Sequence, residues 1–98
     1  MKIHIVDQAE DDLVEGHNFY EDQAPGLGVY FLDCIYSDVD SLVLYAGIHR
    51  IVHKNYRRML SERFPFAIYY TVSADEIKIH AIIDCRRDPA WIRDRLNM

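Results

Sequence analysis

The spacing of apolar residues changes near Gly47, about halfway along this 98-residue chain. Before Gly47, apolar residues recur mostly at three- and four-residue steps, which is typical of one face of an α-helix. After Gly47 they alternate with polar residues in short runs, which is typical of half-buried strands. Helices gathered in one half and strands in the other favour an α+β fold over an alternating α/β fold.

The first half predicts a strand followed by two helices. Residues 2–6 (KIHIV) alternate and predict a strand. Residues 7–23 predict an amphipathic helix, with Asp7 as the expected N-cap and a stop at Pro25-Gly26. A second helix is expected from about Gly28 to Ala46. The short connection between them predicts a helical hairpin.

The second half contains three runs that predict strands, at residues 56–62, 66–72 and 77–84. The last two are separated by a polar turn and predict a β-hairpin. Asp88 and Pro89 then stand as the N-cap and first residue of a short final helix. The expected α+β order is β-α-α-β-β-β-α: an N-terminal strand paired inside the sheet, a helical hairpin, an antiparallel three-stranded sheet and a short C-terminal helix. Its length predicts a single domain over residues 1–98.

The strand alternation also assigns residues to the two faces of the sheet. Packing of the helical hairpin on one face predicts a core made of Leu32, Ile35, Val39, Phe66, Ile68, Tyr70, Ile79 and Ala81. Ile83 is assigned to the same face as Ala81, whereas His80 and Ile82 are assigned to the opposite face. That opposite face is only partly apolar, so we expect it to be either solvated or covered by another molecule.

The charges also divide between the two halves. Residues 1–47 carry one cation against ten acids, a net charge of −9, and residues 48–98 carry ten cations against six acids, a net charge of +4. The two halves sum to the overall charge of −5. This asymmetry predicts a basic working face on an acidic body. A strand region that is Arg-rich without functional consequence is the alternative.

Composition and spacing argue against several classes of protein. No apolar run approaches the roughly 20 residues of a membrane helix, and the N-terminus lacks an apolar signal segment, so a cytoplasmic protein without membrane contact is expected. Cys34 and Cys85 belong to no CxxC or Cys/His cluster and are expected to be free and buried. His49 and His53 are four residues apart but have no third ligand, so neither a metal nor a cofactor is expected.

Two motifs in the second half resemble a known family. Residues 56–58 (YRR), 63–66 (RFPF) and 68–70 (IYY) are similar to the ParE-like pattern of an Arg-rich strand, an R-F-P-Y/F turn and an I-Y-Y strand. Residues 86–91 (RRDPAW), after the last predicted strand, are similar to that family's R-x-P tail and terminal Trp. The predicted N-terminal strand and helical hairpin also fit. The chain therefore resembles the RelE/ParE superfamily of toxins, and most closely the ParE-like plasmid-stabilisation toxins.

This resemblance implies the toxin of a type II toxin–antitoxin system. Such a toxin would inhibit growth by binding a macromolecular target, which is DNA gyrase for ParE-like members, and a cognate antitoxin would neutralise it. The basic second half implies an acidic antitoxin segment, and a homodimer of the free toxin is left open. The residues expected to contact the target or the antitoxin are Arg57, Arg58, Arg63, Tyr69, His80, Ile82, Arg86, Arg87 and Trp91.

RelE-like members of the superfamily instead cleave mRNA on the ribosome, which requires a base, an acid and cations around the phosphate. Arginine can stabilise the developing charge but does not transfer protons. Trp91 stands where RelE-like nucleases place Tyr or His, so His80 is the one candidate for catalysis. We therefore expect no enzymatic activity. An mRNA endonuclease and a non-toxic relative of the same fold remain the alternatives.

Overall fold

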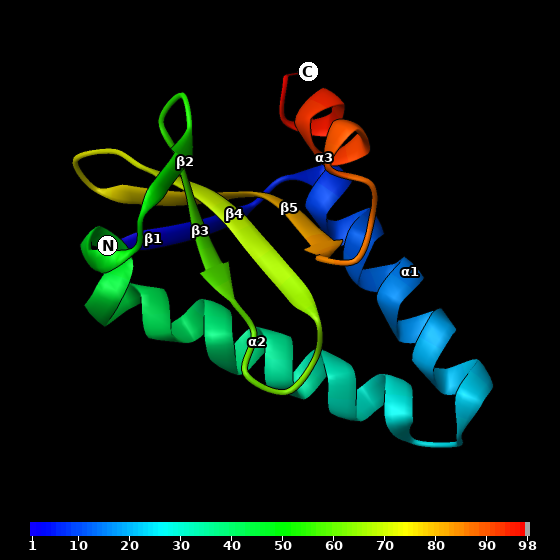
Figure 1. Ribbon diagram of the computed structural model, residues 1–98. Helices are drawn as coiled ribbons and strands as arrows, with labels where there is room; N and C mark the ends of the chain where they lie inside the picture. The colour runs from blue at the N-terminus through cyan, green and yellow to red at the C-terminus, as the bar shows by residue number, and fades with distance from the viewer. Residues whose placement is uncertain (98) are drawn as a thin grey trace.

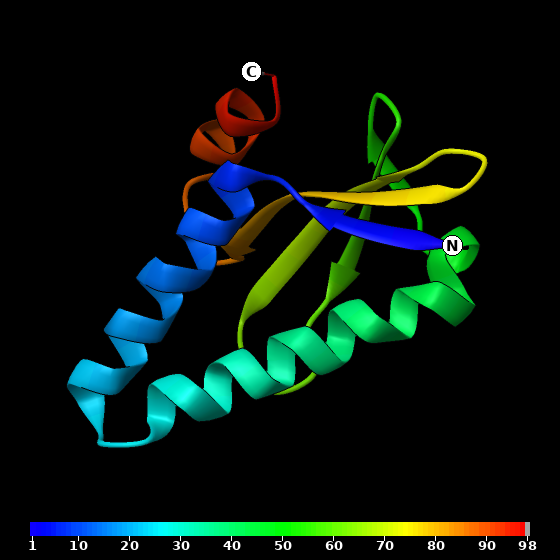
Figure 2. The same ribbon diagram turned by 180° about the vertical axis from the view of Figure 1, so that it is seen from behind.

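The computed structural model describes residues 1–97 and has the expected α+β architecture. Helices α1 and α2 form a V-shaped hairpin beside the sheet, and α3 lies next to the first turns of α1 (Figure 1 and Figure 2). In chain order the elements are β1 (Lys2–Ile5), α1 (Asp7–Gln23), α2 (Leu27–Tyr45), the 3-10 turn η1 (Ala46–Ile48), β2 (Ile51–His53), β3 (Tyr56–Leu60), β4 (Phe66–Val72), β5 (Glu76–Asp84) and α3 (Pro89–Leu96).

The sheet has five strands in the order β1-β5-β4-β3-β2. Strand β1 pairs parallel to β5, and the other neighbours are antiparallel. Two expectations are corrected. Strand β1 lies at an edge instead of inside the sheet, where Ile3 and Ile5 still pack against the core. Strand β2 was not predicted, because it has only three residues and both Ile51 and Val52 are exposed, which removes the alternation that marks a half-buried strand.

The main core lies between the helical hairpin and the sheet. Of the residues expected there, Ile35, Val39, Phe66, Ile68, Tyr70 and Ile79 are buried in it. Leu32 is only half-buried, whereas Phe31, which was not predicted, is fully buried. The reason lies in α1: a Cβ atom at Gly16 would stand 2.5 Å from Cε2 of Phe31. Only glycine at position 16 lets the ring approach so closely, and this contact sets which face of α2 is buried.

A β-bulge reverses the faces of β5 halfway along the strand. Tyr70 pairs with Ile79 and Tyr69 with Ala81, which leaves His80 as one extra residue on β5. Ile82 consequently points into the main core, where its side chain is only 2% exposed. Ala81 and Ile83 lie on the opposite face, in a smaller cluster with Ala67, Tyr69 and Leu96. The assignment of Ala81 and Ile83 to the hairpin side, and of Ile82 to the other, is therefore wrong.

The helix ends are stabilised differently from one another. The Asp88 carboxylate accepts a hydrogen bond from the Ala90 amide at 2.8 Å, which confirms the predicted cap of α3. Asp7 is not an N-cap, because α1 begins at Asp7 and the capping position is Val6, which makes no side-chain bond.

No helix within residues 1–97 is long and apolar enough to cross a membrane. Both cysteines are free, but neither is buried as expected: Cys34 is half-buried and Cys85 is exposed.

Candidate functional site: a groove between α1 and the end of β5

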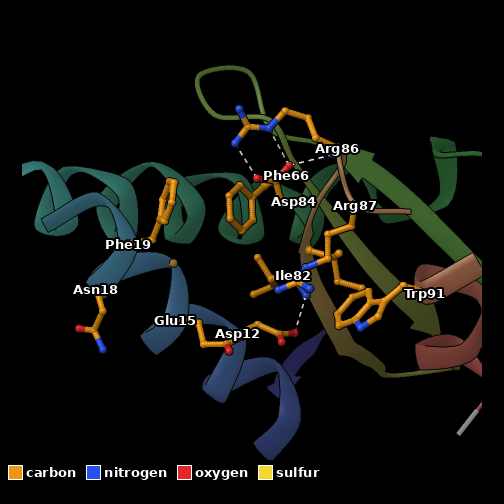
Figure 3. Close-up of a pocket in the computed structure, with 12 residues that line it drawn as sticks. Asp12, Glu15, Asn18, Phe19, Phe66, Ile82, Asp84, Arg86, Arg87 and Trp91 are labelled. Atoms are coloured by element: carbon orange, nitrogen blue, oxygen red, sulfur yellow. Dashed lines mark hydrogen bonds and ion pairs between the residues drawn. The ribbon is translucent and has the colours of Figure 1, made fainter. Parts of the chain in front are cut away.

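A groove of about 560 Å³ opens between α1 and the last residues of β5 (Figure 3). Helix α1 supplies one wall through Glu15 and Phe19. The turn after β5 and the start of α3 supply the opposite wall, and Phe66 and Ile82 form an apolar floor. Three residues expected to contact a partner lie together on the second wall: Arg86, Arg87 and Trp91.

The groove exists because β1 is shorter than β5. The β1–β5 register ends at Ile5 opposite Ile79, so β5 continues past its neighbour without a strand on that side. The next backbone amide on this edge, that of Ile82, donates to Oδ2 of Asp12 on α1 at 2.9 Å. A helix carboxylate thus takes the place of a strand carbonyl, and the buried amide stays paired.

The same carboxylate binds Arg95 of α3. The two guanidinium NH2 groups of Arg95 donate to Oδ1 and Oδ2 of Asp12 at 2.9 and 2.7 Å, a bidentate pair. The two side chains are only 11% and 8% exposed. This Asp12–Arg95 ion pair joins α1, β5 and α3, and so holds the two walls of the groove at a fixed separation.

No pattern in the sequence indicates the Asp12–Arg95 ion pair. Asp12 is one of three consecutive acidic residues in α1 and looks like part of a solvated helix face. Arg95 lies 83 residues later and shares no motif with it. Only the packing of α3 against the first turns of α1 brings the two side chains together (Figure 2).

Arg86 forms an ion pair at the rim of the groove. Its Nε and Nη2 atoms donate to the two oxygens of Asp84 at 2.9 and 2.7 Å, and its backbone amide donates to Oδ1 at 2.8 Å. The hydrogen bonds from Arg86 lower the pKa of the Asp84 carboxyl below its usual value. Because the guanidinium is exposed, this pair contributes little to folding stability. It does hold the Arg86 side chain in one orientation.

Arg87 lies over the ring of Trp91, with its guanidinium carbon 4.1 Å from the ring centroid. This is a cation–π contact in which the indole face attracts the guanidinium charge. Trp91 is partly exposed and lines the groove. Together Arg87 and Trp91 present a positive charge beside an aromatic surface, directly above the apolar floor (Figure 3).

The remaining arginines of the expected contact set lie outside the groove. The Arg57 guanidinium donates to the carbonyls of His49 and Gly47 at 2.6 and 3.4 Å, so it supports the turn before β2. Arg63 donates to the Tyr30 hydroxyl at 3.1 Å. Arg58 is exposed on β3. The structure thus separates the expected cations into a group at the groove and a group on or near β3.

Two expected contact residues are buried. Tyr69 is only 4% exposed, because its ring lies in the small cluster with Leu96 of α3. Ile82 is buried in the main core and reaches the groove only as part of its floor. The expectation that both side chains lie open on the sheet surface is therefore wrong. The bulge at His80 turns Ile82 into the main core, and α3 covers Tyr69. Neither feature can be predicted from strand alternation.

His80, the one candidate for catalysis, is hydrogen-bonded within the sheet. Its Nε2 atom lies 2.9 Å from the Thr71 hydroxyl, and its ring meets the Tyr56 ring edge-to-face at 5.0 Å. Burial, and to a smaller extent Lys78, lowers the pKa of His80, which favours the neutral imidazole. Within residues 1–97 no three His, Cys, Asp or Glu side chains gather in a way that could hold a metal ion.

Comparison with known proteins finds matches among solved structures. No family model and no curated protein matches the chain. Eight chains of solved structures match it. One of them, described as "Chromosomal ParDE TA system from P. aeruginosa", is 25% identical with a TM-score of 0.77, and the match covers 86% of this chain and 95% of that chain. The α+β fold and this likeness confirm the conclusion drawn from the motifs, that the chain resembles the RelE/ParE superfamily of toxins.

Proposed function

We propose that this protein is the toxin of a type II toxin–antitoxin system, that it inhibits growth by binding a macromolecular target such as DNA gyrase, and that a cognate antitoxin neutralises it. The observation that carries the proposal is the likeness in fold to a ParDE toxin–antitoxin system, over 86% of this chain. The RFPF and RRDPAW motifs support the same conclusion independently of the fold, because they are features of the sequence itself.

The groove is the surface that we assign to binding. Its volume of about 560 Å³ falls within the range of roughly 300–1,000 Å³ that is usual for ligand sites. Phe66 and Ile82 offer an apolar floor, while Arg86 and Arg87 offer cations at the rim. Such a site suits a protein segment that places an apolar side chain on the floor and a carboxylate at the rim. Arg87 fits that carboxylate because a planar guanidinium can donate two parallel hydrogen bonds, whereas Nε and Nη2 of Arg86 are already bound to Asp84.

Binding alone, without chemistry, is the mechanism that these side chains support best. The cations at the groove are arginines, which do not exchange protons near neutral pH. The one candidate base, His80, is hydrogen-bonded to Thr71 and belongs to the opposite face of the sheet. An mRNA endonuclease of the RelE type is the second candidate, and the observation that favours it is the neutral His80 ring beside the Tyr56 phenol.

Inducible expression in a bacterium tests the proposal, with growth scored in the presence and absence of the neighbouring gene. We expect growth arrest that the neighbouring gene relieves. The double variant Arg86→Ala/Arg87→Ala should abolish arrest while circular dichroism stays unchanged, and Lys at both positions should restore it only in part. The control Lys2→Ala/Arg93→Ala also removes two positive charges, but from exposed positions outside the groove, and should leave growth arrest unchanged.

The two mechanisms are separated by the His80→Gln variant, which keeps a hydrogen-bonding side chain but does not titrate. A binding toxin should keep its toxicity in this variant and should inhibit gyrase supercoiling in vitro. Two results together would favour the endonuclease. The His80→Gln protein folds but no longer arrests growth, and the protein with His80 cleaves mRNA on the ribosome whereas the variant does not.

A further inference from the structure

The two most exposed large apolar side chains of residues 1–97 stand close together in the sequence, where α2 ends. Leu44 is 78% exposed, and Ile48 of η1 is 73% exposed. They are four residues apart on a helical stretch, so their side chains lie on the same side of it. Val43 and Ile51, which flank this pair, are also about half exposed. Single exposed apolar residues are common, but a group such as this Leu44–Ile48 patch marks a surface that another molecule covers.

Hydrogen bonds hold the backbone beneath the Leu44–Ile48 patch in place. The hydroxyl of Tyr70, a fully buried residue, donates to the Ala46 carbonyl at 2.7 Å. The same hydroxyl oxygen lies 2.6 Å from Nδ1 of His49. The Arg57 guanidinium donates to the His49 carbonyl, so the turn that carries Ile48 is tied to both β3 and β4. A surface fixed in this way loses little conformational entropy when it binds a partner.

The charges on the two sides of the patch have opposite signs. All the charged side chains of α2 are acidic: Asp33, Asp38 and Asp40. Asp40 precedes Leu44 by four residues and therefore lies on the same side of the helix. The first Lys or Arg after the patch is Arg50, and Lys54 follows it. Asp40 and Arg50 are both exposed, and among residues 1–97 neither forms an ion pair. The patch thus has a negative end, an apolar centre and a positive end.

A surface with this pattern is complementary to itself. Rotation of a second copy by 180° brings the negative end of each patch against the positive end of the other, with the apolar centres in contact. Other partners satisfy only part of the pattern. A nucleic acid or an anionic membrane would be attracted by the positive end but repelled by the negative one. A strongly acidic or strongly basic protein segment would likewise be attracted at one end and repelled at the other.

We propose that two copies of this chain associate through the Leu44–Ile48 patch as a two-fold symmetric dimer. Asp40 of each copy faces Arg50 of the other, and Leu44 and Ile48 pack across the axis. The apolar contact supplies affinity, while the two ion pairs set the orientation of the copies. None of these four residues lines the groove, so dimer formation and the proposed function can be tested separately.

Charge reversal tests this pairing, with dimer formation measured by sedimentation equilibrium of the full chain at low salt. The unmodified chain should approach twice the mass of one chain as its concentration rises. Asp40→Lys and Arg50→Glu should each raise the dimer dissociation constant at least tenfold, because each variant brings like charges together. An equimolar mixture of the two variants should restore dimer formation. In the mixed dimer the introduced lysine faces the introduced glutamate, and the native arginine faces the native aspartate.

Two sets of controls separate this effect from a general change in charge or folding. Asp22→Lys in the last turn of α1 and Arg93→Glu in α3 make the same changes of charge at exposed positions away from η1 (Figure 1). Each should leave the dissociation constant within about twofold. Leu44→Ser should raise it at least tenfold, whereas Val14→Ser, at a 58% exposed position of α1, should not. Circular dichroism should stay unchanged in every variant.

Each outcome supports or overturns the dimer. A chain that stays monomeric at every concentration overturns it. A mixture of the Asp40→Lys and Arg50→Glu variants that stays monomeric overturns the pairing of these two residues. Species larger than a dimer in that mixture overturn the two-fold symmetry, because only a head-to-tail contact continues beyond two copies. Restored dimers in the mixture, together with unchanged controls, support the proposal.

Discussion

The two faces of the sheet are covered to different extents and by different interactions. The face toward the helical hairpin contributes to a core that, within residues 1–97, has fifteen buried apolar residues from α1, α2, η1 and the three strands β3, β4 and β5. The opposite face contributes to a cluster of five, to which α3 adds Leu96. Burial of apolar area scales with stabilisation, so the first face can hold its helices by packing alone. The second face buries fewer apolar residues, and the Asp12–Arg95 ion pair gives α3 an additional contact there.

The largest expected effect comes from breaking that ion pair on one side. Arg95→Ala leaves the Asp12 carboxylate buried without a cation, and we expect a loss of about 3–5 kcal/mol in the free energy of unfolding. Urea denaturation, where reversible, measures it. The double variant Asp12→Ala/Arg95→Ala should recover part of the loss, because it removes the uncompensated charge. A loss below about 1 kcal/mol in Arg95→Ala would mean that α3 is held by its apolar contacts.

Truncation in the main core should cost nearly as much. Ile68 is fully buried on the hairpin face, and Ile68→Ala should lower the free energy of unfolding by about 2–5 kcal/mol through lost burial and the cavity left behind. The same denaturation experiment applies. Ile68→Val provides the control, since it removes a single methylene and should cost about 0.5–1.5 kcal/mol. Equal effects for the two substitutions would contradict the packing described for this face.

The equivalent truncation on the other face should cost less. Leu96→Ala removes the contact of α3 with Ala67, Tyr69 and their neighbours, and we expect a loss of about 1–2 kcal/mol. Amide exchange should become faster in α3 while it stays unchanged in α2. Exchange that rises equally in both helices would show that the two faces unfold as one cooperative unit, and would remove the distinction drawn between them.

The smallest expected effect is a dependence of the free energy of unfolding on pH, to which His49 and His80 both contribute. Burial lowers the pKa of His49, with a smaller effect from Arg57, and burial likewise lowers that of His80. Each ring is therefore neutral in the folded protein at pH values where part of the unfolded chain is already protonated. The resulting stability is complete above the usual pKa of 6.5 and is lost as the pH falls below it.

Single variants separate the two histidines. His49→Gln and His80→Gln should each reduce the dependence of unfolding free energy on pH below about 6.5, and neither should change it above pH 8. A steeper dependence on pH below 6.5 in His49→Gln or His80→Gln would contradict this expectation.

The sequence predicted the helical hairpin, the three longer strands and α3, because each has a clear period or a cap such as Asp88. The prediction was wrong where a single local feature shifts the alternation of side chains along a strand. The extra residue at His80 reverses β5, so Ile82 was placed on the wrong face. The groove was only partly predictable: the RRDPAW motif indicated Arg86, Arg87 and Trp91, but the opposite wall comes from α1, which shares no motif with them.

The Asp12–Arg95 ion pair also has a consequence for the order of events during protein synthesis. Asp12 is translated 83 residues before Arg95, and 70 residues before the Ile82 amide that it also binds. Strand β1 likewise waits for β5, its neighbour in the sheet. Domains generally fold as units, and here the groove cannot form until α3 has left the ribosome. The binding surface assigned to Arg86 and Arg87 is therefore complete only after nearly all of this sequence has been translated.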